Sequence, residues 1–313
     1  MDSEEAKLFA AALRQLTQAH SGVALDAALD ELGWADAMAD DSRTAVATLF
    51  ESQGEYDVTS TALDAVIAIA VGLPLGRIVL PALARHDAPG VADGDRIRVH
   101  GLCRGAVSGG VRVVTATSDG YRALSVAPGD YQVKTVAGMA PALKLVEITA
   151  EVAMSDASEP VDWPSGVAAG QRALAHELVG TSRAMLRLAR EHAIERVQFG
   201  RPIASFQAVR HRLAEALVAV EAAHAAADAA WCDDSASTNA ALAKAVAGRS
   251  ARIVARHAQQ VLAGIGFTTE HPLHRHVRRA LVLDGLFGSG RTLTREIGAE
   301  VLRSRQVPRP LPL

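Results

Sequence analysis

The 313-residue sequence has few of the residues that mark disulfide-rich, metal-binding or membrane proteins. Its two cysteines, Cys103 and Cys232, lie far apart and lack the Cys-x-x-Cys spacing of a thiolate site. A disulfide framework is therefore not expected, and a reducing cytoplasm suits the chain. The most apolar stretch, residues 65–76, is too short for the roughly 20 residues that cross a bilayer. The first residues are acidic where a secretory signal would be basic, so we expect a cytoplasmic protein without membrane contact.

Excess charge and aromatic side chains are equally scarce. The chain has 35 acidic and 32 basic residues, a formal net charge of −3, and only 4% aromatic residues. This balance gives no electrostatic reason to expect nucleic acid or an anionic membrane as a partner. Apolar residues are plentiful, at 49% of the chain, and alanine dominates them. Because alanine has the highest helix propensity, the composition favours helices over sheets.

The pattern of apolar residues changes twice along the chain. Residues 1–84 show helical spacing, for example Leu63, Val66 and Ile67 on one face, which predicts an N-terminal helical domain. Residues 85–162 contain alternating and β-branched runs separated by glycine- and proline-containing turns. That texture predicts a small middle β-domain built from an antiparallel sheet or barrel.

Residues 163–313 return to helical spacing and predict four long helices, the last running from Leu273 to Ile297. Four long helices with short links favour an antiparallel four-helix bundle. Helices, then strands, then a helical bundle make an α+β architecture, because strands and helices do not alternate.

The strongest local signal is the segment Glu195–Ile203, which reads ERVQFGRPI. We expect a long helix to end at Gly200, since Pro202 prevents its continuation. Arg196 would then lie one turn from the helix end, free to reach a neighbouring surface. The alternative is an ordinary surface arginine favoured by the helix macrodipole.

A second cluster, Gln259–Phe267, reads QQVLAGIGF. Its small residues at 263, 264 and 266 permit close approach of the backbone to a ligand or another chain. It is not a dinucleotide-binding fingerprint, because the third glycine and a βαβ context are missing. A plain tight turn is the alternative.

These two clusters, in this order, resemble the C-terminal bundle of acyl-CoA dehydrogenases. That family carries an Arg-x-x-Phe-Gly-(Lys/Arg) helix end and a Gln-x-x-Gly-Gly-x-Gly-(Phe/Tyr) turn. The resemblance continues through Glu270-His271-Pro272-Leu273 and Arg278-Arg279-Ala280. It implies the family's fold, with an N-terminal helical domain, a middle β-domain and a C-terminal helical bundle.

In that family each FAD lies at a subunit interface. The resemblance therefore implies that Arg196, Phe199 and Gln207 contact the FAD of a partner subunit. It implies that Gln260 and Gly264 meet the adenine and pyrophosphate end. A fixed guanidinium suits pyrophosphate oxygens, and backbone N–H groups beside a glycine supply further donors.

Two family features are missing. Neither the Thr/Ser-Glu-Pro-x-(Ala/Ser)-Gly-Ser-Asp segment nor the Trp-(Ile/Val)-(Thr/Ser) strand that hold the flavin ring is present. In many members the catalytic base is a glutamate in a Tyr-Glu-Gly-Thr stretch, and Phe287 stands at that position here. Other members place the base about six residues before the arginine of the helix-end motif, where this chain has Arg190, and an arginine cannot take a proton at neutral pH. No catalytic residue is therefore assigned to this chain. Glu191 and Asp284 are the candidates for a relocated base.

The histidines of the second half invite a metal interpretation. His274 and His276 differ by two positions, so they face apart on a helix, and no cysteine completes a site with His271. We expect no metal, and instead a solvated basic face that includes Arg278 and Arg279.

The sequence thus predicts the short β subunit of a heteromeric acyl-CoA dehydrogenase, most simply α2β2. A full-length catalytic partner would bind most of a bulky, steroid-type acyl-CoA, while this chain completes the partner's FAD site. The isolated chain is expected to be inactive. Two alternatives stay open: a self-sufficient homomeric dehydrogenase that uses Glu191 or Asp284, and a non-enzymatic assembly scaffold.

Overall fold

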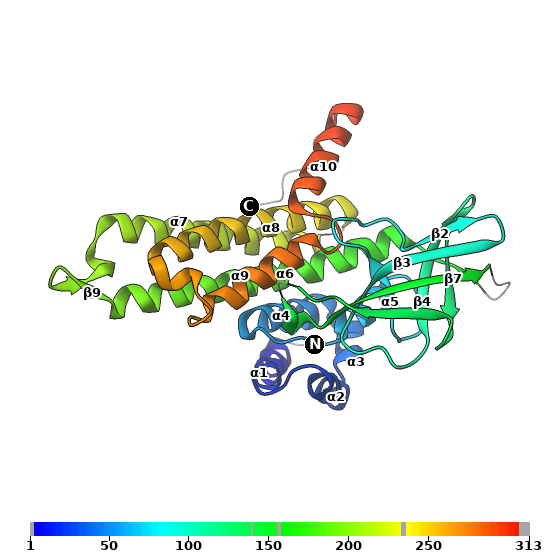
Figure 1. Ribbon diagram of the computed structural model, residues 1–313, viewed down its shortest axis with the longest axis horizontal. Coiled ribbons are helices and arrows are strands. Elements are labelled where there is room, and N and C mark those ends of the chain that lie inside the picture. The colour runs from blue at the N-terminus through cyan, green and yellow to red at the C-terminus, as the bar shows by residue number, and fades with distance from the viewer. Residues whose placement is uncertain (1–2, 139, 155–157, 233–235, 307–313) are drawn as a thin grey trace.

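The computed structural model describes residues 3–138, 140–154, 158–232 and 236–306, and Figure 1 shows helices, a sheet and more helices in that order. The N-terminal helices are α1 (Ser3–Ala19), α2 (Val23–Leu32), α3 (Trp34–Asp40), α4 (Ser42–Tyr56) and α5 (Ala62–Ala70). The later helices are α6 (Trp163–Glu195), α7 (Gln207–Ala229), α8 (Ala236–Leu262), α9 (Leu273–Gly285) and α10 (Gly290–Ser304). The predicted α+β class is confirmed. No helix in the described ranges combines the length and apolarity that crossing a membrane requires.

An eight-stranded sheet stands at one end of the long helices (Figure 1). Its strands are β1 (Leu80–Pro81), β2 (Gly90–Asp93), β3 (Arg96–Arg104), β4 (Val111–Thr117), β5 (Gly120–Val126), β6 (Tyr131–Thr135), β7 (Leu145–Ala153) and β8 (Glu159–Pro160). The order is β6-β7-β3-β2-β4-β5-β8, with β1 beside β3. All pairs between these strands are antiparallel except β2–β4. Alternating residues of β3 and β4, such as Ile97 and Val113, enclose a second apolar core.

Helix α6 is the centre of the molecule, because it packs against α4, α5, α7, α8 and α9. Glycines allow the closest of these contacts. A Cβ atom added at Gly180 would lie 1.9 Å from the carbonyl oxygen of Glu51, and one added at Gly54 would lie 2.1 Å from that of Glu177. The backbones of α4 and α6 therefore touch directly. This contact fixes the N-terminal helices on the bundle.

The predicted helix from Leu273 to Ile297 is wrong, because two helices occupy this stretch. The chain turns at Phe287 and Gly288, whose φ angles of 54° and 89° lie in the left-handed region. Ser289 then caps α10 by accepting a hydrogen bond from the Thr292 N–H (3.1 Å). As a result α10 leaves the bundle and projects away from it (Figure 1).

Candidate functional site

The end of α6 and the start of α7 are joined by a short hairpin. Helix α6 ends at Glu195, five residues earlier than the sequence predicts, and Arg196 is its C-cap. Strands β9 (Val197–Gln198) and β10 (Arg201–Pro202) pair antiparallel. Phe199 and Gly200 form the two-residue turn with φ angles of 54° and 76°, as in a type I′ hairpin. Gly200 therefore serves a strand reversal and not a helix end.

The hairpin exposes an unusual side chain. Phe199 is 91% exposed at the turn. Its ring meets that of Phe206 edge-on, with centroids 6.0 Å apart. On the same hairpin, the Arg201 guanidinium carbon lies 4.3 Å from the centroid of the Phe206 ring, a cation–π contact. The hairpin is thus an ordered projection with an uncovered aromatic ring.

Arg196 and Gln207 flank this hairpin, and both are exposed. Within the described ranges, no hydrogen bond or ion pair engages the Arg196 guanidinium. Gln207 is the first residue of α7, whose N-cap Phe206 offers no side-chain cap. The first N–H groups of a helix have no intrahelical acceptor, so this end of α7 can receive an anion.

The second cluster lies at the same end of the bundle (Figure 1). Helix α8 ends at Leu262 and continues as the 3₁₀ turn η4 (Ala263–Phe267). His257 ties this end of α8 to α7, since its two ring nitrogens lie 3.3 Å from Arg212 and 3.3 Å from Glu215. The start of α7 and the end of α8 are therefore neighbours.

The two glycines of this cluster differ. A Cβ atom at Gly266 would lie 2.9 Å from Leu262, whereas one at Gly264 would meet nothing within 4 Å. Gln260 and Gly264 are both exposed. We call the five residues Arg196, Phe199, Gln207, Gln260 and Gly264 the bundle tip. Its exposed guanidinium and amides, with the first N–H groups of α7, suit a ligand that carries phosphate and a planar ring.

Phe287, which the resemblance places at the position of the catalytic base, lies in the core. Phe287 is completely buried, with its ring centroid 6.2 Å from that of Trp163. A Cβ atom added at Gly170 would lie 3.1 Å from the Phe287 ring. The Phe287 carbonyl accepts a hydrogen bond from Gln171 Nε2 (3.1 Å). An apolar ring thus fills the space into which a carboxylate would project.

Both alternative bases take part in ion pairs. The Asp284 carboxylate is buried, paired with Arg252, and accepts a hydrogen bond from the Gly290 N–H (2.9 Å). Its role is to fasten α8 and α9 to the start of α10. Glu191 lies 3.3 Å from Arg187, one turn away on α6. This exposed pair is of the ordinary surface kind.

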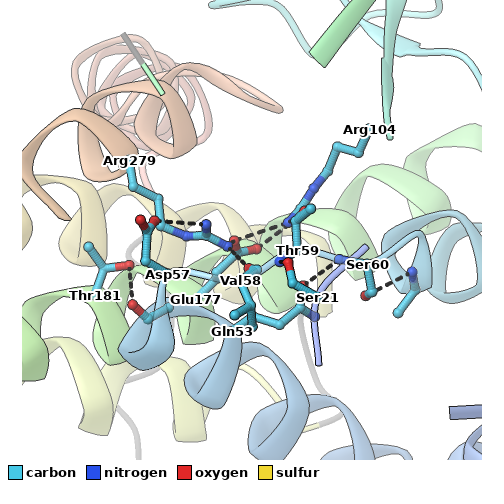
Figure 2. A network of polar contacts seen from close by, with 12 residues as sticks. Ser21, Gln53, Asp57, Val58, Thr59, Ser60, Arg104, Glu177, Thr181 and Arg279 are labelled. Atoms are coloured by element: carbon cyan, nitrogen blue, oxygen red, sulfur yellow. Dashed lines mark hydrogen bonds and ion pairs between the residues drawn. The ribbon is translucent and has the colours of Figure 1, made fainter. Parts of the chain in front are cut away.

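Figure 2 shows a buried ionic cluster that joins the sheet and both helical parts. Glu177 on α6 accepts two hydrogen bonds from Arg104 of β3 (2.9 and 3.1 Å) and one from Arg279 of α9 (2.5 Å). All three side chains have zero exposure. Arg279 also donates to Asp57 after α4 (3.2 Å), and Arg104 donates to Thr59 (3.0 Å).

This cluster corrects the expected solvated basic face. Arg279 is buried, and His276 is only 6% exposed, while Arg278 is exposed. Burial lowers the pKa of His276 to about 4, so this histidine is neutral. Burial alone would raise the pKa of Glu177, but Arg104 and Arg279 hold it below the ordinary value. The basic run Arg278-Arg279 was the available signal, although the buried partner of Arg279 could not be read from the sequence.

Lys244 holds the turn between α9 and α10. Its ammonium is fully buried and donates to the carbonyl oxygens of Asp284 (3.0 Å) and Gly288 (3.2 Å). Burial lowers the pKa of Lys244 from 10.5 to about 8. Together with the Asp284 carboxylate, this lysine fixes the direction in which α10 projects.

Comparison with known proteins matches the bundle to one family. A family model described as "Acyl-CoA dehydrogenase, C-terminal domain" matches residues 167–302. The protein named acyl-CoA dehydrogenase IpdE2 from Mycobacterium tuberculosis is 36% identical over 176 residues, which are 56% of this chain and 53% of that protein. The chain thus spans about half the length of that curated relative.

Two solved structures share the whole fold. The Tcur3481-Tcur3483 steroid ACAD has a TM-score of 0.80 at 20% identity, with 96% of this chain and 99% of that chain covered. The ChsE4-ChsE5 complex from Mycobacterium tuberculosis has a TM-score of 0.78 at 21% identity, with 99% of each chain covered. At such identities the likeness establishes the fold.

Proposed function

We propose that this chain, whose residues 167–302 match the C-terminal domain model of the acyl-CoA dehydrogenases, completes the FAD site of a catalytic partner subunit. The observation that carries the proposal is a contrast within one chain. The bundle tip is exposed and its arginine has no ion-pair partner in the described ranges. The base position is filled by the buried ring of Phe287. The chain is equipped to contact a cofactor but not to remove a proton.

Members of this family depend on FAD, and the bundle tip fits part of it. Arg196 and the uncapped start of α7 would hold the pyrophosphate oxygens. Gln260 and the open space at Gly264 would receive the adenine end, and Phe199 would pack on a ring or on the partner's surface. Bound FAD would accept the hydride that leaves the acyl Cβ atom.

The reaction would be α,β-dehydrogenation of an acyl-CoA. A carboxylate of the partner would take the α-proton, since this chain presents a phenylalanine at the corresponding place. The residues of this chain would hold the cofactor in position and exclude water from one side of it. This positioning role requires no acid or base in the bundle tip.

We propose a full-length acyl-CoA dehydrogenase as the partner, most simply in an α2β2 assembly. The names of the two fold relatives support this, because each joins two components. One of them is named a steroid acyl-CoA dehydrogenase, so a bulky, steroid-derived acyl-CoA is the proposed substrate class. A cytoplasmic location, expected from the cysteine content, belongs to this proposal.

The two alternatives have less support. A self-sufficient enzyme would need Asp284 or Glu191 as base, yet Asp284 is fastened to Arg252 and Gly290, and Glu191 is paired with Arg187. A pure scaffold would have no use for an exposed, unpaired Arg196 next to an uncapped helix start. The geometry therefore favours a cofactor-completing subunit.

The proposal is tested by two purifications. In one the chain is expressed alone, and in the other it is co-expressed with a full-length acyl-CoA dehydrogenase. We expect a colourless, inactive chain and a yellow complex that oxidises acyl-CoA. A yellow, active homomer would refute the partner role, and a colourless complex would show a scaffold.

Arg196→Ala is the matching variant. Losing a desolvated, charge-assisted pair costs about 2–5 kcal/mol, so flavin content at fixed flavin concentration should fall sharply while the complex still assembles. Arg275→Ala, at an exposed arginine of α9 without an ion pair in the described ranges, should leave flavin content unchanged. Equal flavin content in both variants would mean that the bundle tip does not contact the cofactor.

A further inference from the structure

Charge is distributed very unevenly along this nearly neutral chain. Residues 1–57 contain 12 acidic and 3 basic residues, whereas residues 163–313 contain 20 basic and 12 acidic residues. The N-terminal helices are thus strongly negative and the bundle strongly positive. Such segregation has no role in burying a core, but it acts on other molecules over about a Debye length, ~8 Å at physiological salt.

Part of the positive charge lies on two adjoining helices, α8 and α10. Arg249 and Arg256 are seven residues apart on α8 and therefore share a side of the helix. Arg291 and Arg295 are four residues apart on α10 and likewise share a side. All four are exposed, and none forms an ion pair within the described ranges. We call these four residues the arginine face.

The two helices meet beside Arg249, so the two arginine pairs lie on adjoining helices. A Cβ atom added at Gly290, the first residue of α10, would lie 3.0 Å from the Ala245 carbonyl and 3.5 Å from Arg252. Arg249 lies between those two α8 positions. Arg252 itself is neutralised by Asp284, which leaves the arginine face as the unpaired charge at this junction.

Helix α10 also lacks apolar cover. Only Gly290 and Leu293 are buried, both at its start, while Leu302 is 81% exposed near its end. The outer turns project from the molecule (Figure 1). Isolated helices shorter than about 12–15 residues are marginal in water. The outer part of α10 therefore gains stability when another chain packs against it.

A second copy is a poor occupant of this surface. A two-fold symmetric pair would place the same patch on both sides and bring the guanidinium groups together. Like charges across an interface are strongly unfavourable. The acidic N-terminal helices of another copy could approach instead, but that contact is head-to-tail and forms open chains unless its rotation closes a ring.

We propose that the arginine face docks on an acidic helical face of the full-length partner subunit and prevents self-pairing of this chain. The proposal rests on the proposed function for the existence of that partner, and adds the chemistry by which the partner is chosen. Charge complementarity accelerates encounter, whereas repulsion rejects a second copy. The bundle tip contacts the cofactor; the arginine face selects the chain that carries it.

The test removes these charges and measures association with the full-length dehydrogenase that co-purifies with the chain. The variant is Arg249→Gln/Arg256→Gln/Arg291→Gln/Arg295→Gln, and it should fold because all four side chains are exposed and unpaired. The matched control is Arg275→Gln/Arg278→Gln, at exposed arginines of α9 that also lack ion pairs. Association rates are measured by surface immobilisation at about 50 mM and about 300 mM salt.

We expect the fourfold variant to associate at least about tenfold more slowly and to lose most of the salt dependence. The control should stay within about threefold of the wild type, and the wild-type chain alone should be monomeric in light scattering. Equal rates for the fourfold variant and the wild type would overturn the proposal, as would a wild-type homo-oligomer that the fourfold variant disrupts. Arg196→Ala separates the two proposals, because it should reduce flavin content without slowing association.

Discussion

Glu177 shows how much a single residue contributes in this molecule. Its buried carboxylate accepts hydrogen bonds from Arg104 and Arg279, which no solvent reaches. Charges held this way add little stability compared with an apolar core, but removing one partner leaves an uncompensated charge. Glu177 therefore acts as the common partner that makes two buried arginines tolerable.

We predict that Glu177→Gln lowers the free energy of unfolding by about 3–5 kcal/mol, because two guanidinium groups remain buried without their anion. Urea denaturation followed by circular dichroism measures this. Glu191→Gln, which removes an exposed pair on the same helix, should cost no more than about 0.5 kcal/mol. Similar losses for both variants would contradict the role of the cluster.

Lys244 predicts a pH dependence. Its pKa is about 8 in the folded chain and 10.5 ordinarily, so the unfolded chain holds more protons between these values. The free energy of unfolding should then rise with pH across this window, by up to roughly 3 kcal/mol from this group. Below pH 8 Lys244 is protonated in both the folded and the unfolded chain, so this gain in stability is absent.

The measurement compares wild type with Lys244→Met at about pH 8 and at about pH 10.5. Subtracting the variant removes the effect of every other titrating group that it leaves unchanged. If the difference in the free energy of unfolding between wild type and Lys244→Met does not grow with pH, Lys244 has the same pKa in the folded and unfolded chain, and the prediction is wrong.

At the scale of helices, the backbones of α4 and α6 touch where they cross. Gly180→Ala would place a methyl group against the Glu51 carbonyl, so we expect a loss of about 2–3 kcal/mol from overpacking. Gly298→Ala is the matched control on α10, where a Cβ atom meets nothing within 4 Å. There the higher helix propensity of alanine should stabilise by about 0.5–1 kcal/mol. Thermal unfolding of both variants shows whether each substitution raises or lowers the stability.

The turn between α9 and α10 carries functional meaning at the same scale. One uninterrupted helix would have kept residues 286–304 on the bundle axis. The left-handed residues Phe287 and Gly288 redirect the chain, and Lys244 fixes the redirection. The same four-residue link thus buries the ring of Phe287 and projects α10 outward.

For the whole molecule, the ionic cluster connects the sheet to both sets of helices. We predict that the most protected amides of strand β3 and of helix α6 have the same opening free energy in hydrogen exchange. The reason is that Arg104 of β3 is bonded to Glu177 of α6. Arg104→Met should lower the protection of β3 more than that of α6. The control is Arg98→Met, at an exposed arginine of the same strand paired only with Asp93. Native-state hydrogen exchange in increasing urea provides the test, and equal effects of the two variants would contradict the coupling.

The sequence alone determined the α+β order of elements and the resemblance of the bundle to that of acyl-CoA dehydrogenases. These follow from local periodicity, from composition and from short motifs, which do not depend on distant residues. The sequence also identified the segments of the bundle tip, although it placed the end of α6 at Gly200. Left-handed φ values at Phe199 and Phe287 were not predictable, because β-carbon sterics disfavour them and only the surrounding packing compensates.

Only the tertiary structure decided which charges are buried and which are free. Arg279 and Arg278 are neighbours in a basic run, yet one lies at zero exposure against Glu177 and the other faces solvent. Arg104, Glu177 and Arg279 are far apart in sequence, and the folded chain alone brings them together (Figure 2). The sequence around an arginine is the same whether its side chain forms a buried ion pair or stays exposed at the surface. The difference is set by long-range packing, which buries Arg279 and leaves the arginine face and Arg196 exposed.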